Sequence, residues 1–484
     1  MTHAEENAAL RAEVAMLREQ VAVLLAENAD LKARLGKDSH NSSKPPSSDG
    51  LKRRPPLTRS LRQKTQKKPG GQLGHRGETL HLVMTPDVVE EHRPSVCAAC
   101  QTVLDATQAG ACVEQRQVQD LPVTRLVVTE HRALRVRCPA CQHETVGAFP
   151  AEALSRTQYG PALRGLAVYL VTQQFLPYER TCDALADLYG VALSAGTVAA
   201  WVQQSADVLG GFETNLKAAL RQAPLLHSDE TGVRLAGTTV WAHVTSTATL
   251  THYAVHAKRG HLATDAIGIL PGYQGVSVHD GWKAYQRYAR ARHALCNVHH
   301  LRELTGVAEG PAEGPAEGPA ATQQVWASQL KALLCEMKTV ADATRAAGLA
   351  HIAPALQTAM RSRYHTLLAA GLAANPPPER RPRQRGRSKQ SAARNLLERL
   401  LVGEHQVLAF LDDLTIPFDN NQAERDVRMF KVQQKVSGGF RSQAGADAFA
   451  RLRSYVSTLR KQGGKLLDAL RSTFAGPLIY PALG

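Results

Sequence analysis

The chain has 484 residues, of which 43% are hydrophobic and 21% are charged, so it can form several domains with buried cores and is not disordered overall. Its 58 Lys and Arg against 43 Asp and Glu give a net charge of +15, a balance that favours a polyanionic partner. No N-terminal apolar segment has the character of a signal peptide, and no apolar run approaches the roughly 20 residues that cross a bilayer, so we expect a cytoplasmic protein.

Residues 5–37 carry the apolar seam of a leucine-zipper coiled coil. The seam alternates steps of four and three residues: Leu10, Val14, Leu17, Val21, Leu24, Asn28 and Leu31. Valine and leucine in these alternating positions favour a parallel two-stranded coil, and one buried Asn fixes its register. We therefore predict a homodimer through this helix; an amphipathic helix that packs on its own protein is the alternative.

Residues 38–85 are rich in Pro, Gly, Ser and basic residues, and nine basic residues but no acid lie between Leu51 and Arg76. Such a segment cannot bury a core and is a solvated linker or a tract that follows a phosphate backbone. The candidate DNA-binding residues here are Lys52, Arg53, Arg54, Lys64, Lys67 and Lys68.

Residues 86–150 contain two Cys-x-x-Cys pairs, Cys97 with Cys100 and Cys138 with Cys141. In a reducing compartment such pairs favour metal binding over disulfides, and four thiolates predict one structural Zn²⁺ in a zinc ribbon with strands between the pairs. A site closed by four thiolates leaves no position for a substrate, so this zinc would stabilise the fold.

Residues 158–215 have the rhythm of a helix-turn-helix, with a turn at Gly190 and a second helix capped by Ser194. This hairpin either contacts DNA or serves as a plain packing module.

Residues 222–304 change to strand periodicity. Residues 223–231 predict a short buried strand with Asp229 near its C-terminal end. Residues 239–247 and 250–256 predict the next strands of a meander, and residues 275–282 predict a strand with Asp280 near its C-terminal end. Since side chains alternate along a strand, Glu230 is expected to point away from Asp229.

Residues 415–465 open with Pro417 and an Asp/Asn run that predicts the start of a helix. Asn421, Glu424 and Arg428 then fall on one helical face. If Asp229 and Asp280 meet Glu424 in space, the three carboxylates repel one another unless divalent cations neutralise them, and oxygen ligands suit Mg²⁺ or Mn²⁺.

About 140 residues separate Asp280 from Glu424, so we expect a helical insertion with low-complexity loops at 305–414. Just before it, Cys296 and His299 have the spacing of half a zinc site, but no second half is visible in the sequence. After the third acid, Arg425, Lys431 and Lys435 extend the basic surface that DNA could contact.

Several strings together resemble the insertion-sequence-66 family of DDE transposases. They are His227-Ser-Asp-Glu-Thr-Gly232, Ser277-Val-His-Asp-Gly-Trp282, Cys296-Asn-Val-His-His-Leu-Arg-Glu303 and Pro417-Phe-Asp-Asn-Asn-Gln-Ala-Glu-Arg425, with the N-terminal strings Asn41-Ser-Ser-Lys-Pro-Pro-Ser-Ser-Asp49 and Pro69-Gly-Gly-Gln-Leu-Gly-His75. The tandem Ala-Glu-Gly-Pro repeat from Ala308 to Pro319 departs from the family pattern.

The resemblance implies a multidomain α/β protein whose ribonuclease H-like mixed-sheet core binds two catalytic Mg²⁺ through Asp229, Asp280 and Glu424, with Cys296, His299, Asn421 and Arg428 beside them. It also implies double-stranded DNA as partner, namely the terminal repeats of the element and the target DNA, together with companion transposition proteins and a bacterial, nucleoid-associated location. The alternative functions are a catalytically inactive, zinc-containing DNA-binding regulator, a nuclease that cuts but does not join, and a structural coiled-coil adaptor.

Overall fold

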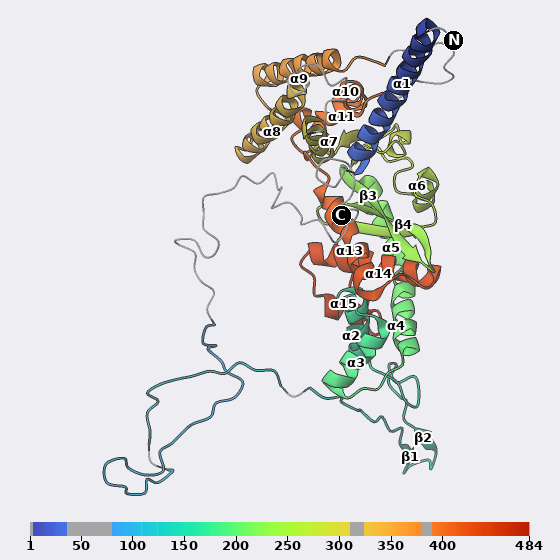
Figure 1. Cartoon of the computed structure of the whole chain (residues 1–484). Helices are drawn as coiled ribbons and strands as arrows, with labels where there is room; N and C mark the ends of the chain where they lie inside the picture. Colours follow the sequence, from blue (N-terminus) through green and yellow to red (C-terminus); the bar gives the residue numbers. More distant parts are fainter. Residues whose placement is uncertain are drawn as a thin grey trace. The chain divides into compact units, whose positions relative to one another are not determined.

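A computed structural model describes residues 3–35, 80–107, 109–122, 124–309, 324–378 and 390–483 (Figure 1). They fall into two compact units, one containing residues 3–35, 129–187 and 191–483 and the other containing residues 80–128 and 188–190. The basic residues Lys52, Arg53, Arg54, Lys64, Lys67 and Lys68 and the Ala-Glu-Gly-Pro repeat from residue 310 on lie outside the described residues. Among the described residues, no helix has the length and apolar character that a bilayer crossing requires.

The N-terminal helix α1 spans His3–Leu35, so the expected zipper segment is helical. The apolar residues of its seam are all exposed: Leu10, Val14, Leu17, Val21, Leu24 and Leu31. An exposed apolar stripe of this length is the face that a second copy would cover in a coiled coil.

Each Cys-x-x-Cys pair forms the same tight turn in its own unit. In the first, the Cys97 N–H donates to the carbonyl of Thr102 at 2.8 Å and Gln101 has a φ of 60°. In the second, the Cys138 N–H donates to the carbonyl of His143 at 2.8 Å and Gln142 has a φ of 63°. Strands β1 (Arg135–Arg137) and β2 (Glu144–Val146) flank the second turn as an antiparallel pair, whereas the residues from 125 to 134 form no strand.

The helix-turn-helix-like segment consists of α3 (Tyr178–Tyr189) and α4 (Ala195–Val208). Gly190 takes the left-handed conformation with φ of 67°, and the Ser194 hydroxyl accepts from the Thr197 N–H at 3.1 Å. The expected cap is therefore confirmed. Trp201 is buried on α4 and its ring meets that of Tyr159 edge-on, so this face of the second helix serves packing.

The core is a five-stranded mixed sheet in the order β5-β4-β3-β6-β7. Its strands are β3 (Leu225–Leu235), β4 (Thr238–Ser246), β5 (Thr251–His256), β6 (Val276–His279) and β7 (Arg292–Leu295). The strands β3, β4 and β5 are antiparallel neighbours, while β6 and β7 run parallel to β3. This order is compatible with a ribonuclease H-like core.

The central strand β3 is longer than the sequence pattern predicted. The expected strand ended near Asp229, but β3 continues to Leu235, where the hairpin residues Ala236 and Gly237 both have positive φ and return the chain into β4. Pairing with β4 all along this extension supplies the backbone hydrogen bonds that prolong the strand. Asp229 is therefore in the middle of β3, not at its end.

Helices α13 (Asn421–Ser437) and α14 (Gln443–Lys461) pack on β3, β4 and β5 (Figure 1). Ala423, Val427 and Phe430 recur at helical spacing on α13 and enter one core with Val233 and Val240 of the sheet. Helix α5 (Gly210–Gln222) also contacts β5, whereas α2 (Pro161–Thr172) and α15 (Leu466–Ser472) pack on each other and on α14. The remaining elements of this region are α6 (His261–Ile267) and a short 3₁₀ turn at Tyr285–Arg287.

The insertion is helical, as expected, and shares a core with the sheet. It comprises α7 (Asn297–Glu309), α8 (Val325–Ala346), α9 (Pro354–Ala374), α10 (Ala392–Val402), α11 (Glu404–Val407) and α12 (Ala409–Asp412). Val278 of β6 and Ala294 of β7 join Trp326, Leu397 and Phe410 in one apolar cluster. The expected boundary at residue 304/305 falls inside α7, so the insertion begins directly after β7.

Gly165 tests the packing of α2 against α15. A Cβ added at Gly165 would lie 2.8 Å from the backbone nitrogen of Arg471, a distance that the two helices cannot keep. We expect Gly165→Ala to lower the free energy of unfolding by about 2 kcal/mol through overpacking. At Gly211 of α5 no atom lies within 4 Å of the added Cβ, so Gly211→Ala should raise the free energy of unfolding by about 0.5 to 1 kcal/mol. Urea denaturation checks both, and equal effects would contradict the close approach.

Candidate active site

Asp229 lies in β3, and Asp280 directly follows the parallel neighbour β6. The last pair in the register between these strands is His227 of β3 with Val278 of β6. Two residues further along the chain come Asp229, still in β3, and Asp280, one residue past the end of β6. Parallel neighbours are spaced about 4.8 Å apart, which brings both carboxyl groups to the same part of the sheet.

Glu424 comes to the same region in the first turn of α13. The helix start is tied to β3 by Asn420, whose side chain accepts from His227 Nδ1 at 2.9 Å and donates to the carbonyl of Ser228 at 2.8 Å. The Asn420 amide thus binds the sheet, and Asp419 Oδ1 instead accepts from the Asn421 N–H at 3.0 Å. Residues almost 200 positions apart in the chain therefore fix where the third acid lies.

The three acids affect one another electrostatically. Burial raises the pKa of Asp229 well above its usual value, and the charges of Glu230, Asp280 and Glu424 raise it further. Burial also raises the pKa of Asp280 and of Glu424, and Asp280 adds to the effect at Glu424. Carboxylates held together in a poorly hydrated site disfavour their ionised form, and a divalent cation removes that penalty. The donor set therefore fits the hard oxygen-bound cations expected from the sequence.

Glu230 lies close to this cluster but is occupied by protein partners. Its Oε1 accepts from Arg259 Nε at 2.8 Å, and its Oε2 accepts from the Tyr285 hydroxyl at 2.5 Å. The Arg259 guanidinium also stacks on the Trp282 ring at 4.1 Å. Glu230 is therefore part of a buried hydrogen-bonded pair, and nothing in its surroundings requires an added cation.

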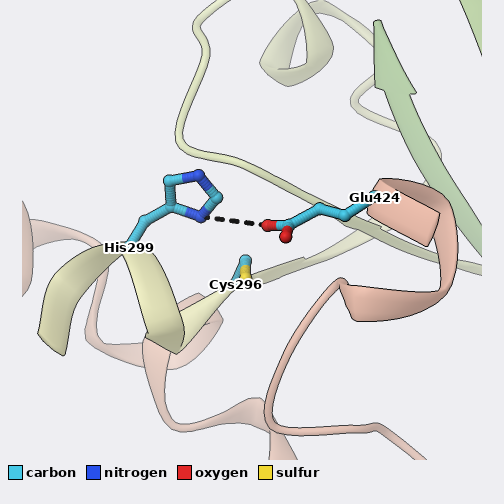
Figure 2. A group of neighbouring side chains, drawn as sticks. All are labelled: Cys296, His299 and Glu424. Atoms are coloured by element: carbon cyan, nitrogen blue, oxygen red, sulfur yellow. Dashed lines mark ion pairs between the residues drawn. The ribbon is translucent and has the colours of Figure 1, made fainter. Parts of the chain in front are cut away.

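Cys296 and His299 meet Glu424 at the start of α7. Figure 2 shows the His299 and Glu424 side chains pointing toward each other from α7 and α13, with Cys296 beside them. One ligand atom from each of the three residues lies within 4.8 Å of the others. Glu424 thus lies beside the two residues that have the spacing of half a zinc site, a neighbour that no local spacing could reveal.

The other residues expected near the acids differ in their surroundings. Asn421 and Arg428 are exposed on α13, and the charge of Arg428 lowers the pKa of Glu424. Arg425 and Lys435 are exposed as well. The Lys431 ammonium donates to the carbonyl of Gly232, so it is engaged with β3 instead of facing solvent freely.

Sequence reasoning missed several residues that organise the site. Arg302 on α7 places Nη2 3.8 Å from Glu424 Oε1, and Arg259 and Tyr285 hold Glu230. The Cys296-to-Glu303 string did include Arg302 at one turn beyond His299, a spacing that could have suggested a shared helix face. No sequence signal marks Arg259.

Asn420 tests how the third acid is positioned. Asn420→Ala would leave His227 Nδ1 and the Ser228 carbonyl without partners in a buried place, so we expect the free energy of unfolding to fall by about 2 to 4 kcal/mol. Asn421→Ala changes the exposed neighbouring residue and should lower the free energy of unfolding by less than about 0.5 kcal/mol. Urea denaturation compares the two, and a matching small loss for both would show that Asn420 does not anchor α13.

Comparisons with known proteins identify the family of the chain. The chain matches the Transposase IS66 family over residues 156–448, which include all three acids, and a family of unknown function (DUF6444) over residues 2–81. It is also 25% identical over 405 residues to the uncharacterized protein y4jD of Sinorhizobium fredii, covering 78% of this chain and 73% of that protein. The resemblance seen in the sequence motifs is confirmed. The chain belongs to the IS66 family of transposases, enzymes that bind, cut and transfer DNA with a divalent metal.

Proposed function

We propose that the chain is a DDE transposase that binds the ends of its own insertion sequence and catalyses DNA cleavage and strand transfer by in-line transesterification. Asp229, Asp280 and Glu424 would hold two Mg²⁺. The observation that carries this proposal is that three partly buried carboxyl groups, from β3, the end of β6 and α13, lie close enough for Asp280 and Glu424 to raise the pKa of Asp229 and for Asp280 to raise that of Glu424. An acid cluster of this kind is costly without cations and is suited to a reaction that needs them.

When bound, the Mg²⁺ ions would polarise the scissile phosphate and activate a water or 3′-hydroxyl nucleophile. The chain itself supplies the positions of the ligands. The Asn420 bonds hold the start of α13 against β3, and the Trp282 N–H donates to Asp280 Oδ1 at 3.1 Å and orients that carboxylate. The exposed Arg425, Arg428 and Lys435 on α13 would attract the phosphate backbone near the acids.

The N-terminal parts would serve assembly and DNA binding. The exposed seam of α1 supports a homodimer, and the two Cys-x-x-Cys spacings in the sequence are the basis for one structural Zn²⁺ that Cys97, Cys100, Cys138 and Cys141 would bind. The basic residues from Lys52 to Lys68 would contact DNA without reading its sequence. Companion proteins and the terminal repeats remain predictions from the resemblance.

Substitution of each acid tests the catalytic proposal. Asp229→Asn, Asp280→Asn and Glu424→Gln should each lower Mg²⁺-dependent cleavage and joining of DNA carrying the element ends by at least about 100-fold, because each removes an electrostatic contribution to catalysis. DNA affinity in a gel-shift assay should change little. Glu179→Gln removes an exposed carboxylate on α3 and is the matched control with unchanged activity.

The outcomes separate the candidate functions. Any of the three variants that cuts at the wild-type rate would remove that residue from the site. A wild-type protein that binds the ends but never nicks them in Mg²⁺ would be the inactive regulator, and one that nicks without strand-transfer products would be the nuclease. Activity of Asp280→Cys in Mn²⁺ but not in Mg²⁺ would identify that position as a metal ligand, since thiolate is a poor ligand for Mg²⁺.

The seam of α1 tests the dimer. We expect Leu17→Asp with Leu24→Asp to weaken self-association by about 100-fold or more, because two charges per helix would be buried in the seam. Leu25 is equally exposed but lies off the seam, so Leu25→Asp should leave the dimer intact. Sedimentation equilibrium of the full chain measures both, and a dimer that survives the seam variant would contradict the zipper.

A further inference from the structure

We propose that Cys296, His299 and Glu424 form a second kind of metal site, one for a transition-metal dication of the Zn²⁺ type, distinct from the Mg²⁺ positions and joined to them through Glu424. Cys296 Sγ, one ring nitrogen of His299 and a Glu424 carboxylate oxygen lie within 4.8 Å of one another. They come from two elements, with Cys296 and His299 at the start of α7 and Glu424 on α13 (Figure 2). The proposal rests on the proposed function only in that Glu424 serves both sites.

Two buried polar atoms of this site have no hydrogen-bond partner. His299 Nδ1 and Glu424 Oε1 are both buried and make no hydrogen bond. They are 4.0 Å apart, and Arg302 Nη2 lies 3.8 Å from the same oxygen, so each contact is longer than a hydrogen bond. A buried nitrogen and a buried carboxylate oxygen that face one another without hydrogen bonds are costly, and a cation between them would satisfy both.

The chemistry of the three ligands determines which metal ion the site would bind. Sulfur and imidazole nitrogen are soft or borderline ligands that favour Zn²⁺ and its neighbours, whereas Mg²⁺ requires an octahedron of oxygens. Shifts of about 1 Å or less would bring the three atoms to Zn–ligand distances of about 2.0 to 2.3 Å. Three protein ligands leave a fourth position open, as in zinc sites that also hold water or substrate.

The surroundings of Cys296 fit a bound sulfur. Its side chain is 1% exposed, and Sγ accepts from the Asn420 N–H at 3.2 Å. An N–H donor of this kind stabilises charge on a metal-bound thiolate and orients it. Asn420 also binds the start of α13 to β3, so a metal ion on Cys296 would stabilise the segment that positions Glu424.

A metal ion at this site would affect the Mg²⁺ positions through the carboxylate of Glu424, which both sites share. With one Glu424 oxygen bound by the Zn²⁺-type ion, the carboxylate would be fixed in orientation and its other oxygen would remain for a hard cation. In the absence of the ion, the Arg302 charge lowers the pKa of Glu424 and offsets part of the cost of its burial. Cys296 and His299 would then be positioning residues for Glu424 and would not contact DNA.

The test measures zinc bound to the full chain without DNA, so its result is separate from that of the cleavage assay. The protein is equilibrated with micromolar Zn²⁺ in millimolar Mg²⁺, dialysed, and its zinc content is determined by mass spectrometry. We expect Cys296→Ser and His299→Ala each to hold one zinc per chain fewer than the wild type. Cys182→Ser replaces another buried thiol, on α3, and should retain the wild-type zinc content.

Equal zinc content in the wild type and all three variants would overturn the proposal. Circular dichroism identifies any variant that fails to fold, and Co²⁺ substitution supplies a second measurement on the wild type and His299→Ala. In this measurement the wild-type chain should bind one Co²⁺ more than His299→Ala, with a stronger thiolate-to-metal charge-transfer band. Identical Co²⁺ spectra would likewise exclude the site.

Discussion

The cost of ionising three partly buried carboxyl groups is the constraint on which the candidate active site depends. Burial is the main cause that raises the pKa of Asp229, Asp280 and Glu424. The charges of Asp280 and Glu424 raise the pKa of Asp229 further, and the charge of Asp280 raises that of Glu424. Such an arrangement persists only because a well-packed core holds it. The β3–β6 register fixes two of the acids, and the apolar face of α13 against the sheet fixes the third.

Glu230 shows how the fold separates a structural acid from the catalytic candidates. It follows Asp229 directly in the strand, its charge raises the pKa of Asp229, and burial and then the charge of Asp280 raise the pKa of Glu230 itself. Arg259 and Tyr285 neutralise and bind its two oxygens, so its charge is balanced by protein groups. Glu424 Oε1 has no comparable hydrogen bond, so this oxygen is free to bind a metal ion.

The helical insertion belongs to the architecture of the site. Since α7 begins directly after β7, it carries Cys296, His299 and Arg302 toward Glu424, and its apolar residues share a core with β6 and β7. A change in the packing of the insertion would therefore reach the third acid through α7. This coupling links the packing of the long insertion to the position of Glu424.

The sequence by itself determined the local elements. Heptad spacing marked α1, alternation marked β4, β5 and β6, and Pro417 with the Asp/Asn run marked the start of α13, because these signals depend on a residue and its near neighbours. Only the tertiary structure decided the length of β3, the binding of Asn420 to the sheet, the pairing of Glu230 with Arg259, and the meeting of Cys296 and His299 with Glu424. Each of these depends on contacts between segments that are distant in the chain, and the periodicity of a single segment carries no information about which distant side chain it will face.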